Sequence, residues 1–264
     1  MATDELVEHL ENGILWITLN RPEKLNALTT NMISGLRTSL EKASVNEEVR
    51  VVVLLGAGRG FCAGGDVQSM AEEDVEPAPL EVRAQQLRLG MESARLLYEM
   101  PKPTIAMTRG AVAGAGLSLA LACDLIIASD TLKMTSAFIN VALSGDFGST
   151  YFLVHRLGHR AREFALLSPV IKADEAKELG LVNRVVPDDE LQAETDKLAT
   201  RLAEGPGITQ GHIKANLNFV EQGATLAQLL DHEAIRHIRC GETDDHHEAA
   251  SAFVEKRTPV FRNR

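Results

Sequence analysis

The sequence predicts an α/β protein, and three features support that class. Short runs of aliphatic and β-branched residues, such as Val51 to Leu55, alternate with longer segments whose apolar residues recur every three or four positions. Glycine-rich loops follow two of these short runs. From about residue 189 onward the pattern is helical. We therefore expect an α/β body over residues 1–200, followed by a helical region over residues 201–264.

Local patterns place the expected elements along the chain. Asn12-Gly13 is a typical hairpin turn between two strands, Thr29 or Thr30 can cap the first helix, and Pro101 ends the second. The expected strands are 5–10, 13–19, 51–55, 104–107, 124–129, 132–136 and 182–186. The expected helices are 31–44, 80–100 and 116–122, and after the loop 138–148 further helices alternate with the strand 182–186.

Composition excludes several classes of protein. The 264 residues carry a formal net charge of −10, and such a chain is a poor partner for nucleic acid, which requires clustered Lys and Arg. Its three cysteines show no short spacing, which argues against a disulfide framework and favours a reducing cytoplasm. The acidic N-terminus lacks an apolar signal core, and no stretch approaches the ~20 apolar residues that span a bilayer. We expect a cytoplasmic protein with no nucleic-acid or membrane partner.

Two glycine-rich loops, 56–66 and 110–116, are the most informative local feature. Neither fits the dinucleotide pattern G-x-G-x-x-G, because Phe61 and Leu119 stand where the last glycine belongs. Tight turns without large side chains expose backbone N–H groups, and two such groups aimed at one point form an oxyanion hole. A helix starting near Gly116 would add its N-terminal dipole. Spacing alone leaves open that both loops are only tight turns beside close packing.

The motifs in and around these loops resemble the crotonase (enoyl-CoA hydratase/isomerase) superfamily. Residues 61–66, Phe-Cys-Ala-Gly-Gly-Asp, are similar to its oxyanion signature F-[CS]-A-G-x-D. The other segments that resemble the family, in the same order along the chain, are 19–28, 102–107, 110–116, 122–128, 179–186 and 253–259. The resemblance implies stacked ββα turns that form a spiral core holding an acyl-CoA site. It also implies a helical C-terminal oligomerisation region, in a homotrimer or a dimer of trimers.

The resemblance also implies a set of site residues for an acyl-CoA thioester. The N–H groups of Ala63 and Ala115 would form the oxyanion hole, and Asp66 would cap a helix and hold the loop. Lys24 and Lys256 would meet coenzyme A phosphates, the latter across a subunit boundary. No cofactor or metal is implied, since coenzyme A belongs to the substrate. The expected binding set is Lys24, Leu25, Ala27, Ala63, Gly64, Gly65, Asp66, Val67, Gly114, Phe138, Phe253 and Lys256.

The catalytic carboxylates of the family differ here. Its hydratases use two glutamates, and Ser118 and Phe138 occupy those positions, which argues against ordinary hydration. Asp146 stands where isomerase branches carry a single acid. The branch that looks closest, the 1,2-epoxyphenylacetyl-CoA isomerases, shares the patterns A-G-A-G-x-x-L-A-L and D-x-G-[GS]-T. We therefore expect an acyl-CoA isomerase in which Asp146, its pKa raised by an apolar pocket, moves a proton.

Four alternatives stay open at this stage. Asp146 could be an exposed turn residue, as Gly-Asp often is. The protein could be a hydratase with altered residues, or a binding homologue without catalysis. It could also be an aryl-CoA dehalogenase-like enzyme with a nucleophilic Asp, although that branch carries Trp at the position of Phe138 and the single Trp here is Trp16. Cys62 is expected to be a buried neutral thiol rather than a nucleophile. Four histidines are expected to be solvated and not to bind a metal: His232, His237, His246 and His247.

Overall fold

The computed structural model describes residues 5–67 and 78–264. Within these residues the main sheet has the strand order β1-β2-β3-β4-β6-β9. Strands β1 and β2 form an antiparallel hairpin, and the others pair in parallel. Asn12 and Gly13 have positive φ angles of 51° and 79°, so the hairpin turn is as expected. The strands are β1 (Leu6–Glu11), β2 (Ile14–Leu19), β3 (Val51–Gly56), β4 (Thr104–Thr108), β6 (Leu125–Ser129) and β9 (Arg184–Val186).

A second, smaller sheet lies beside the first. It consists of β5 (Ala111–Ala113), β7 (Lys133–Thr135) and β8 (Ile171–Lys172), with β5 parallel and β8 antiparallel to β7. Strands β5 and β8 are both absent from the elements expected from sequence. Strand β5 lies inside the segment 110–116, which was expected to be a loop, and the two residues of β8 are too few to show an alternating pattern. Because β5 lies within the second glycine-rich loop, the small sheet helps to position that loop.

Both faces of the main sheet are buried, which explains its apolar strands. Val52 and Leu54 of β3 pack into one apolar cluster with helices α1, α4 and α5. Val51 and Val53, which alternate with them, pack into a second cluster with helix α9. The helices of the body are α1 (Thr30–Val45), α3 (Leu80–Gly90), α4 (Glu92–Glu99), α5 (Ala115–Ala122), α6 (Ser149–Leu157), α7 (Arg160–Leu167), α8 (Ala173–Glu178) and α9 (Leu191–Ala203).

The single helix expected over 80–100 is two helices, α3 and α4, and that expectation is wrong in this respect. The interruption lies at Gly90 and Met91, where the Ser93 hydroxyl donates to the Gly90 carbonyl at 2.9 Å. An added Cβ at Gly90 would lie 2.7 Å from the Ile33 side chain. Close packing against α1 and a side-chain hydrogen bond thus break a pattern that is continuous in sequence.

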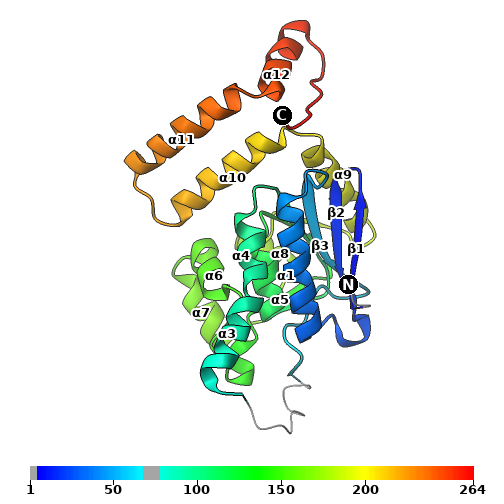
Figure 1. Cartoon of the computed structure of the whole chain (residues 1–264). Coiled ribbons are helices and arrows are strands. Elements are labelled where there is room, and N and C mark those ends of the chain that lie inside the picture. The colour runs from blue at the N-terminus through cyan, green and yellow to red at the C-terminus, as the bar shows by residue number, and fades with distance from the viewer. Residues whose placement is uncertain (1–4, 68–77) are drawn as a thin grey trace.

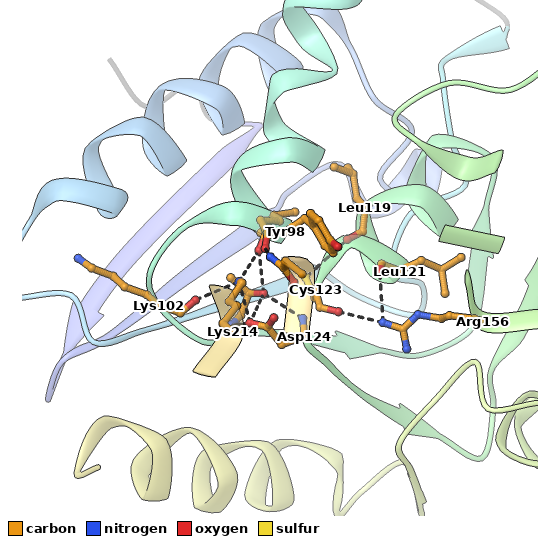
Figure 2. Close-up of polar contacts among 11 residues, drawn as sticks. Tyr98, Lys102, Leu119, Leu121, Cys123, Asp124, Arg156 and Lys214 are labelled. Carbon is orange, nitrogen blue, oxygen red and sulfur yellow. Dashed lines mark hydrogen bonds and ion pairs between the residues drawn. The ribbon is translucent and has the colours of Figure 1, made fainter. Parts of the chain in front are cut away.

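The C-terminal region extends away from the body as three helices (Figure 1): α10 (Gly207–Glu221), α11 (Leu226–Gly241) and α12 (Asp244–Glu255). Helix α9 ends at Ala203, so the expected division at residue 200 falls inside it. A buried Lys214 fastens α10 to the body (Figure 2). Its Nζ donates to the Leu97 carbonyl at 2.7 Å, the Lys102 carbonyl at 3.1 Å and Asp124 Oδ2 at 2.8 Å.

Helix α5, which leads away from the second glycine-rich loop, is held at its C-terminal end. Arg156 Nη2 on α6 donates to the carbonyls of Leu121 and Cys123, each at 3.2 Å (Figure 2). The last carbonyls of a helix lack internal N–H donors, so a cationic donor is favourable there. Every residue of α5 is buried. None of the helices among residues 5–67 and 78–264 has the length and apolar character needed to cross a membrane.

Candidate active site

The two glycine-rich loops lie side by side. The Cys62 N–H donates to the Ala111 carbonyl at 3.0 Å, and the Ala113 N–H donates to the Cys62 carbonyl at 2.9 Å. A Cβ added at Gly116 would lie 2.5 Å from the Cys62 carbonyl oxygen, a distance that real side chains do not adopt. Glycine at 116 therefore permits the close approach that aligns the two loops.

The backbone N–H of Ala115 is available to a ligand. Ala115 is the first residue of α5, so its N–H has no acceptor four residues earlier. Gly114, which precedes it with φ 53° and ψ −128°, provides no side-chain cap. The N-terminal end of the helix dipole also favours a negative oxygen at this place. The structure is thus compatible with the expected role of Ala115 as an oxyanion donor.

Ala63 does not fit the donor role that the resemblance implied. Its N–H already donates to the Leu25 carbonyl at 2.9 Å, and that bond holds the first loop to the preceding segment. The neighbouring Gly65 N–H has no hydrogen-bond acceptor among the described residues, whereas the Asp66 N–H donates to the Leu28 carbonyl at 3.3 Å. The donor role expected for Ala63 is therefore contradicted. Among the described residues the N–H groups of Gly64 and Gly65, which follow Ala63, have no acceptor, and Gly65 is the candidate donor of this loop.

Asn26 organises the first loop, and the sequence reasoning did not single it out. Its buried side-chain Nδ2 lies within hydrogen-bond distance of the carbonyls of Ala57 (2.9 Å), Gly60 (2.8 Å) and Phe61 (3.1 Å). Its own backbone has φ 57°, a left-handed conformation that Asn tolerates better than most residues. An Asn in the segment 19–28 before a glycine-rich loop was the available sequence signal.

Asp66 holds the same loop by an ion pair. Its Oδ2 lies 3.0 Å from Arg21 Nη1, which also donates to the Ala27 carbonyl at 2.8 Å. The expected holding role is confirmed, and the pair joins the segment 21–27 to the end of the loop. The helix that Asp66 was expected to cap falls largely outside the described residues.

Asp146 lies on the loop between residues 138 and 149, in an apolar setting. Its Oδ1 is buried without a hydrogen-bond partner among the described residues, and burial raises the pKa of this carboxyl to about 6. Gly145, Phe147 and Gly148 around it all have positive φ angles, so the backbone is sharply turned. A carboxyl with a raised pKa and no ion-pair partner fits a proton-transfer base. The expectation of a raised pKa is confirmed, and a fully solvated turn residue is excluded.

Phe138 and Ser118 occupy the two positions for which the resemblance implied glutamate in hydratases. The Phe138 ring lies 3.9 Å from the Cβ positions that Gly114 and Gly145 would have, so it forms an apolar wall between the oxyanion segment and the Asp146 loop. Ser118 is fully buried on α5, and its hydroxyl donates to the Asp146 carbonyl at 3.0 Å. Neither side chain can act as an acid or base for water addition.

The structure places some of the residues expected to bind coenzyme A next to the first loop and others far from it. Lys24 is exposed, Leu25 is half-buried with φ 49°, and Ala27 is buried, all next to the first loop. Gly64 packs within the site, since a Cβ there would lie 3.5 Å from the Gly114 α-carbon. Val67, 48% exposed, follows Asp66 directly.

Phe253 and Lys256 lie on and just after α12, far out on the helical arm (Figure 1). Phe253 is 86% exposed. Within one chain these residues are therefore not brought to the site, and their contact with coenzyme A across a subunit boundary stays a prediction.

Cys62 is excluded as a nucleophile. Burial raises the pKa of its thiol to about 12, and its Sγ donates to the Asn26 carbonyl at 3.2 Å. The expected inert, buried thiol is confirmed. Of the histidines considered as metal ligands, His232 pairs with Asn216 and stacks on Phe219. No group of three or more His, Cys, Asp or Glu side chains suited to a metal occurs among residues 5–67 and 78–264.

Comparison with known proteins identifies the family. The enoyl-CoA hydratase/isomerase family profile matches residues 9–264. The chain is 37% identical over 257 residues to 1,2-epoxyphenylacetyl-CoA isomerase of Escherichia coli (strain K12), covering 97% of both proteins. It is 35% identical over 257 residues to a probable enoyl-CoA hydratase of Rhodobacter capsulatus, covering 97% of this chain and 96% of that protein. An enoyl-CoA hydratase crystal structure from Polaromonas sp. JS666 has a TM-score of 0.91 at 33% identity, covering 97% and 99% of the chains.

The chain therefore belongs to the enoyl-CoA hydratase/isomerase family and has the crotonase fold. Both the resemblance stated from the motifs and the expected fold class are confirmed. The relatives carry the names of isomerases and of hydratases, so the family by itself covers both reactions.

Proposed function

We propose that the protein is an acyl-CoA isomerase that shifts a double bond or isomerises a ring epoxide through a thioester enolate. The observation that carries this proposal is the half-buried carboxyl of Asp146, whose Oδ1 is buried without a hydrogen-bond partner among the described residues, in a site where Ser118 and Phe138 stand at the positions of the two glutamates that the resemblance implies for hydratases. The substrate is an acyl-CoA thioester, and the reaction needs no separate cofactor, since coenzyme A is part of the substrate. The relative at 37% identity is named as an isomerase, which supports an isomerase rather than a hydratase reaction.

For a double-bond shift, the reaction is a proton transfer in two steps. The Asp146 carboxylate removes a proton from the acyl chain, and the electron pair moves through the conjugated system onto the thioester oxygen. The N–H groups of Gly65 and Ala115 donate to that oxygen and stabilise the enolate. The Asp146 carboxyl then returns the proton to a different carbon, and the thioester carbonyl is restored. Each oxyanion donor of this kind contributes about 3–4 kcal/mol.

The electrostatics of the site suit this cycle. A base works best when its pKa lies near the working pH, because it must both accept and return the proton. The pKa of Asp146, raised to about 6 by burial, leaves the carboxyl mainly ionised at pH 7 and still able to hold a proton transiently. The apolar ring of Phe138, next to Gly145 on the same loop as Asp146, disfavours an ordered attacking water.

Mass spectrometry of 3-enoyl-CoA incubated with the enzyme in heavy water tests the reaction. We expect the 2-enoyl isomer without added water, formed by the wild type and not by Asp146→Asn. An exposed carboxylate changed in the same way, Asp189→Asn, is the matched control and keeps activity. Hydrated product would mean that the enzyme adds water without the two glutamates. If 3-enoyl-CoA is not converted, a ring-epoxide thioester is the second substrate to test, and bound but unconverted substrate in both cases would contradict an isomerase.

We further propose that the active assembly is a homotrimer or a dimer of trimers. Apolar side chains on the helical arm, including Leu217, Ile235 and Phe253, are 62%, 57% and 86% exposed in the single chain. Such faces are normally covered by another chain. Light scattering of the purified protein tests the assembly, and a monomeric mass would contradict it.

A further inference from the structure

Ser118 connects the two halves of the site. It lies on α5, three residues after Ala115, and is fully buried. Its Oγ lies 3.0 Å from the Asp146 carbonyl oxygen and 3.3 Å from the Gly114 carbonyl oxygen. A hydroxyl has one hydrogen, so the shorter contact to Asp146 is the better donor geometry.

The Asp146 loop needs such a connection because regular structure does not hold it. Positive φ angles occur at Ala142, Gly145 and Phe147, so the backbone turns repeatedly. The Asp146 carbonyl accepts one other bond, from the Ser149 N–H at 2.9 Å, which ties it only to its own following helix α6. Among the described residues, the Ser118 hydroxyl is the hydrogen-bond donor that ties Asp146 to α5.

Helix α5 provides one oxyanion donor, the N–H of Ala115. In the proposed mechanism the Ala115 N–H, at the first turn of α5, donates to the enolate oxygen, and the Asp146 carboxyl acts on the carbon chain of the same substrate. The distance between donor and base therefore depends on how the loop sits against α5. A misplacement of about 1 Å in such an arrangement can cost roughly 10²-fold in rate.

We propose that Ser118 is a positioning residue that holds the Asp146 loop against α5. This contact keeps the Asp146 carboxyl in an apolar environment and fixes its distance from the oxyanion donors. This inference rests on the proposed isomerase function. It gives Ser118 a role in this chain that differs from the acid–base role of the glutamate at the same position in hydratases.

The effect of Ser118 on Asp146 can be measured through the pKa of the Asp146 carboxyl, because burial raises that pKa. Burial is the sole cause of the raised Asp146 pKa, with no contribution from a charged group on α5, on residues 138–141 or on α6. If the loop shifts toward solvent, this cause weakens and the pKa falls toward its ordinary value of 3.8. Ser118→Ala should therefore change both the rate and its pH dependence.

The first test compares Ser118→Ala with Ser39→Ala. Ser39 is also buried in a helix, but its hydroxyl has no hydrogen-bond partner among the described residues, so it is a matched control. For Ser118→Ala we expect kcat to fall about 10–100-fold with KM changed less than about threefold. The acid limb of the kcat profile should move down from about pH 6 by at least one unit. Ser39→Ala should keep the wild-type profile.

A second measurement does not depend on activity. Asp146→Asn should raise the Tm at pH 7.5, because it removes a buried charge, and in a Ser118→Ala background this increase should be at least halved. If Ser118→Ala turns over substrate with an unshifted acid limb, and Asp146→Asn raises the Tm by the same amount with and without Ser118→Ala, the positioning role is overturned and the isomerase proposal stands. Coupling as expected, with no turnover of any acyl-CoA by the wild type, would overturn the isomerase proposal instead.

Discussion

Replacing Asp146 by Asn should make the protein more stable while it removes catalysis. The folded-state pKa of Asp146 is about 6, against 3.8 for an unperturbed aspartate, because burial disfavours the charged form. Folded protein therefore binds the proton more tightly than unfolded protein does. The cost of the charge is absent below about pH 4, grows as the pH rises toward 6, and is constant above it.

The size of the effect follows from that shift. About two pKa units correspond to roughly 3 kcal/mol at 1.36 kcal/mol per unit, and partial solvent exposure of Asp146 reduces this to about 1–2 kcal/mol. At roughly 2–4 °C per kcal/mol for a chain of this size, Asp146→Asn should raise the Tm by about 2–8 °C at pH 7.5. Near pH 4 the wild-type carboxyl is protonated and resembles the amide, so the two melting temperatures should converge.

Activity should change in the opposite direction. Loss of a general base typically costs 10²–10⁴-fold, and we expect kcat of Asp146→Asn to fall within that range. Wild-type kcat/KM at pH 5 should be about a tenth of its plateau, since about one carboxyl in eleven is ionised one unit below its pKa. Thermal melts at pH 7.5 and 4.0, with initial rates across pH 4–8, measure both effects. Equal melting temperatures at pH 7.5, or a difference that does not vary with pH, would refute a desolvated carboxyl.

Three further predictions concern the loops, the helical arm and the thiols. Gly116→Ala should lower kcat by about 10²–10³-fold by forcing the loops apart, measured by initial rates, whereas Gly241→Ala, which has open space, should leave kcat unchanged. Lys214→Met should lower the free energy of unfolding by about 3 kcal/mol, because its carboxylate partner loses a buried cation, measured by urea denaturation. Native alkylation followed by mass spectrometry should modify half-buried Cys240 and spare Cys62 until the protein unfolds.

Each of these has a clear contrary result. Full activity of Gly116→Ala would mean that loop contact does not set the donor geometry. An unchanged urea midpoint for Lys214→Met would mean that the arm is held by apolar contacts alone. Rapid labelling of Cys62 in the native protein at pH 8 would contradict its burial beneath the second loop.

Much of the fold could be predicted because its signals are local. The hairpin at Asn12-Gly13 and the cap at Thr29 each depend on a few adjacent residues, and the structure confirms both, with the Thr29 hydroxyl accepting from the Met32 N–H at 3.1 Å. The two-residue strand β8 and the break at Gly90 were not predictable in this way. The first is too short to show a period, and the second depends on packing against Ile33.

The sequence by itself determined the family, the two glycine-rich loops and Asp146 as the candidate base, since these depend on residue types in a fixed order. Only the tertiary structure decided which N–H groups are free. Ala63 and Gly65 are two positions apart in one motif, yet the first is used by the Leu25 carbonyl and the second is not. The link from Ser118 to Asp146 spans 28 positions and also exists only in the fold. Hydrogen-bond partners and burial are properties of chain segments that meet in space, and a linear pattern does not contain them.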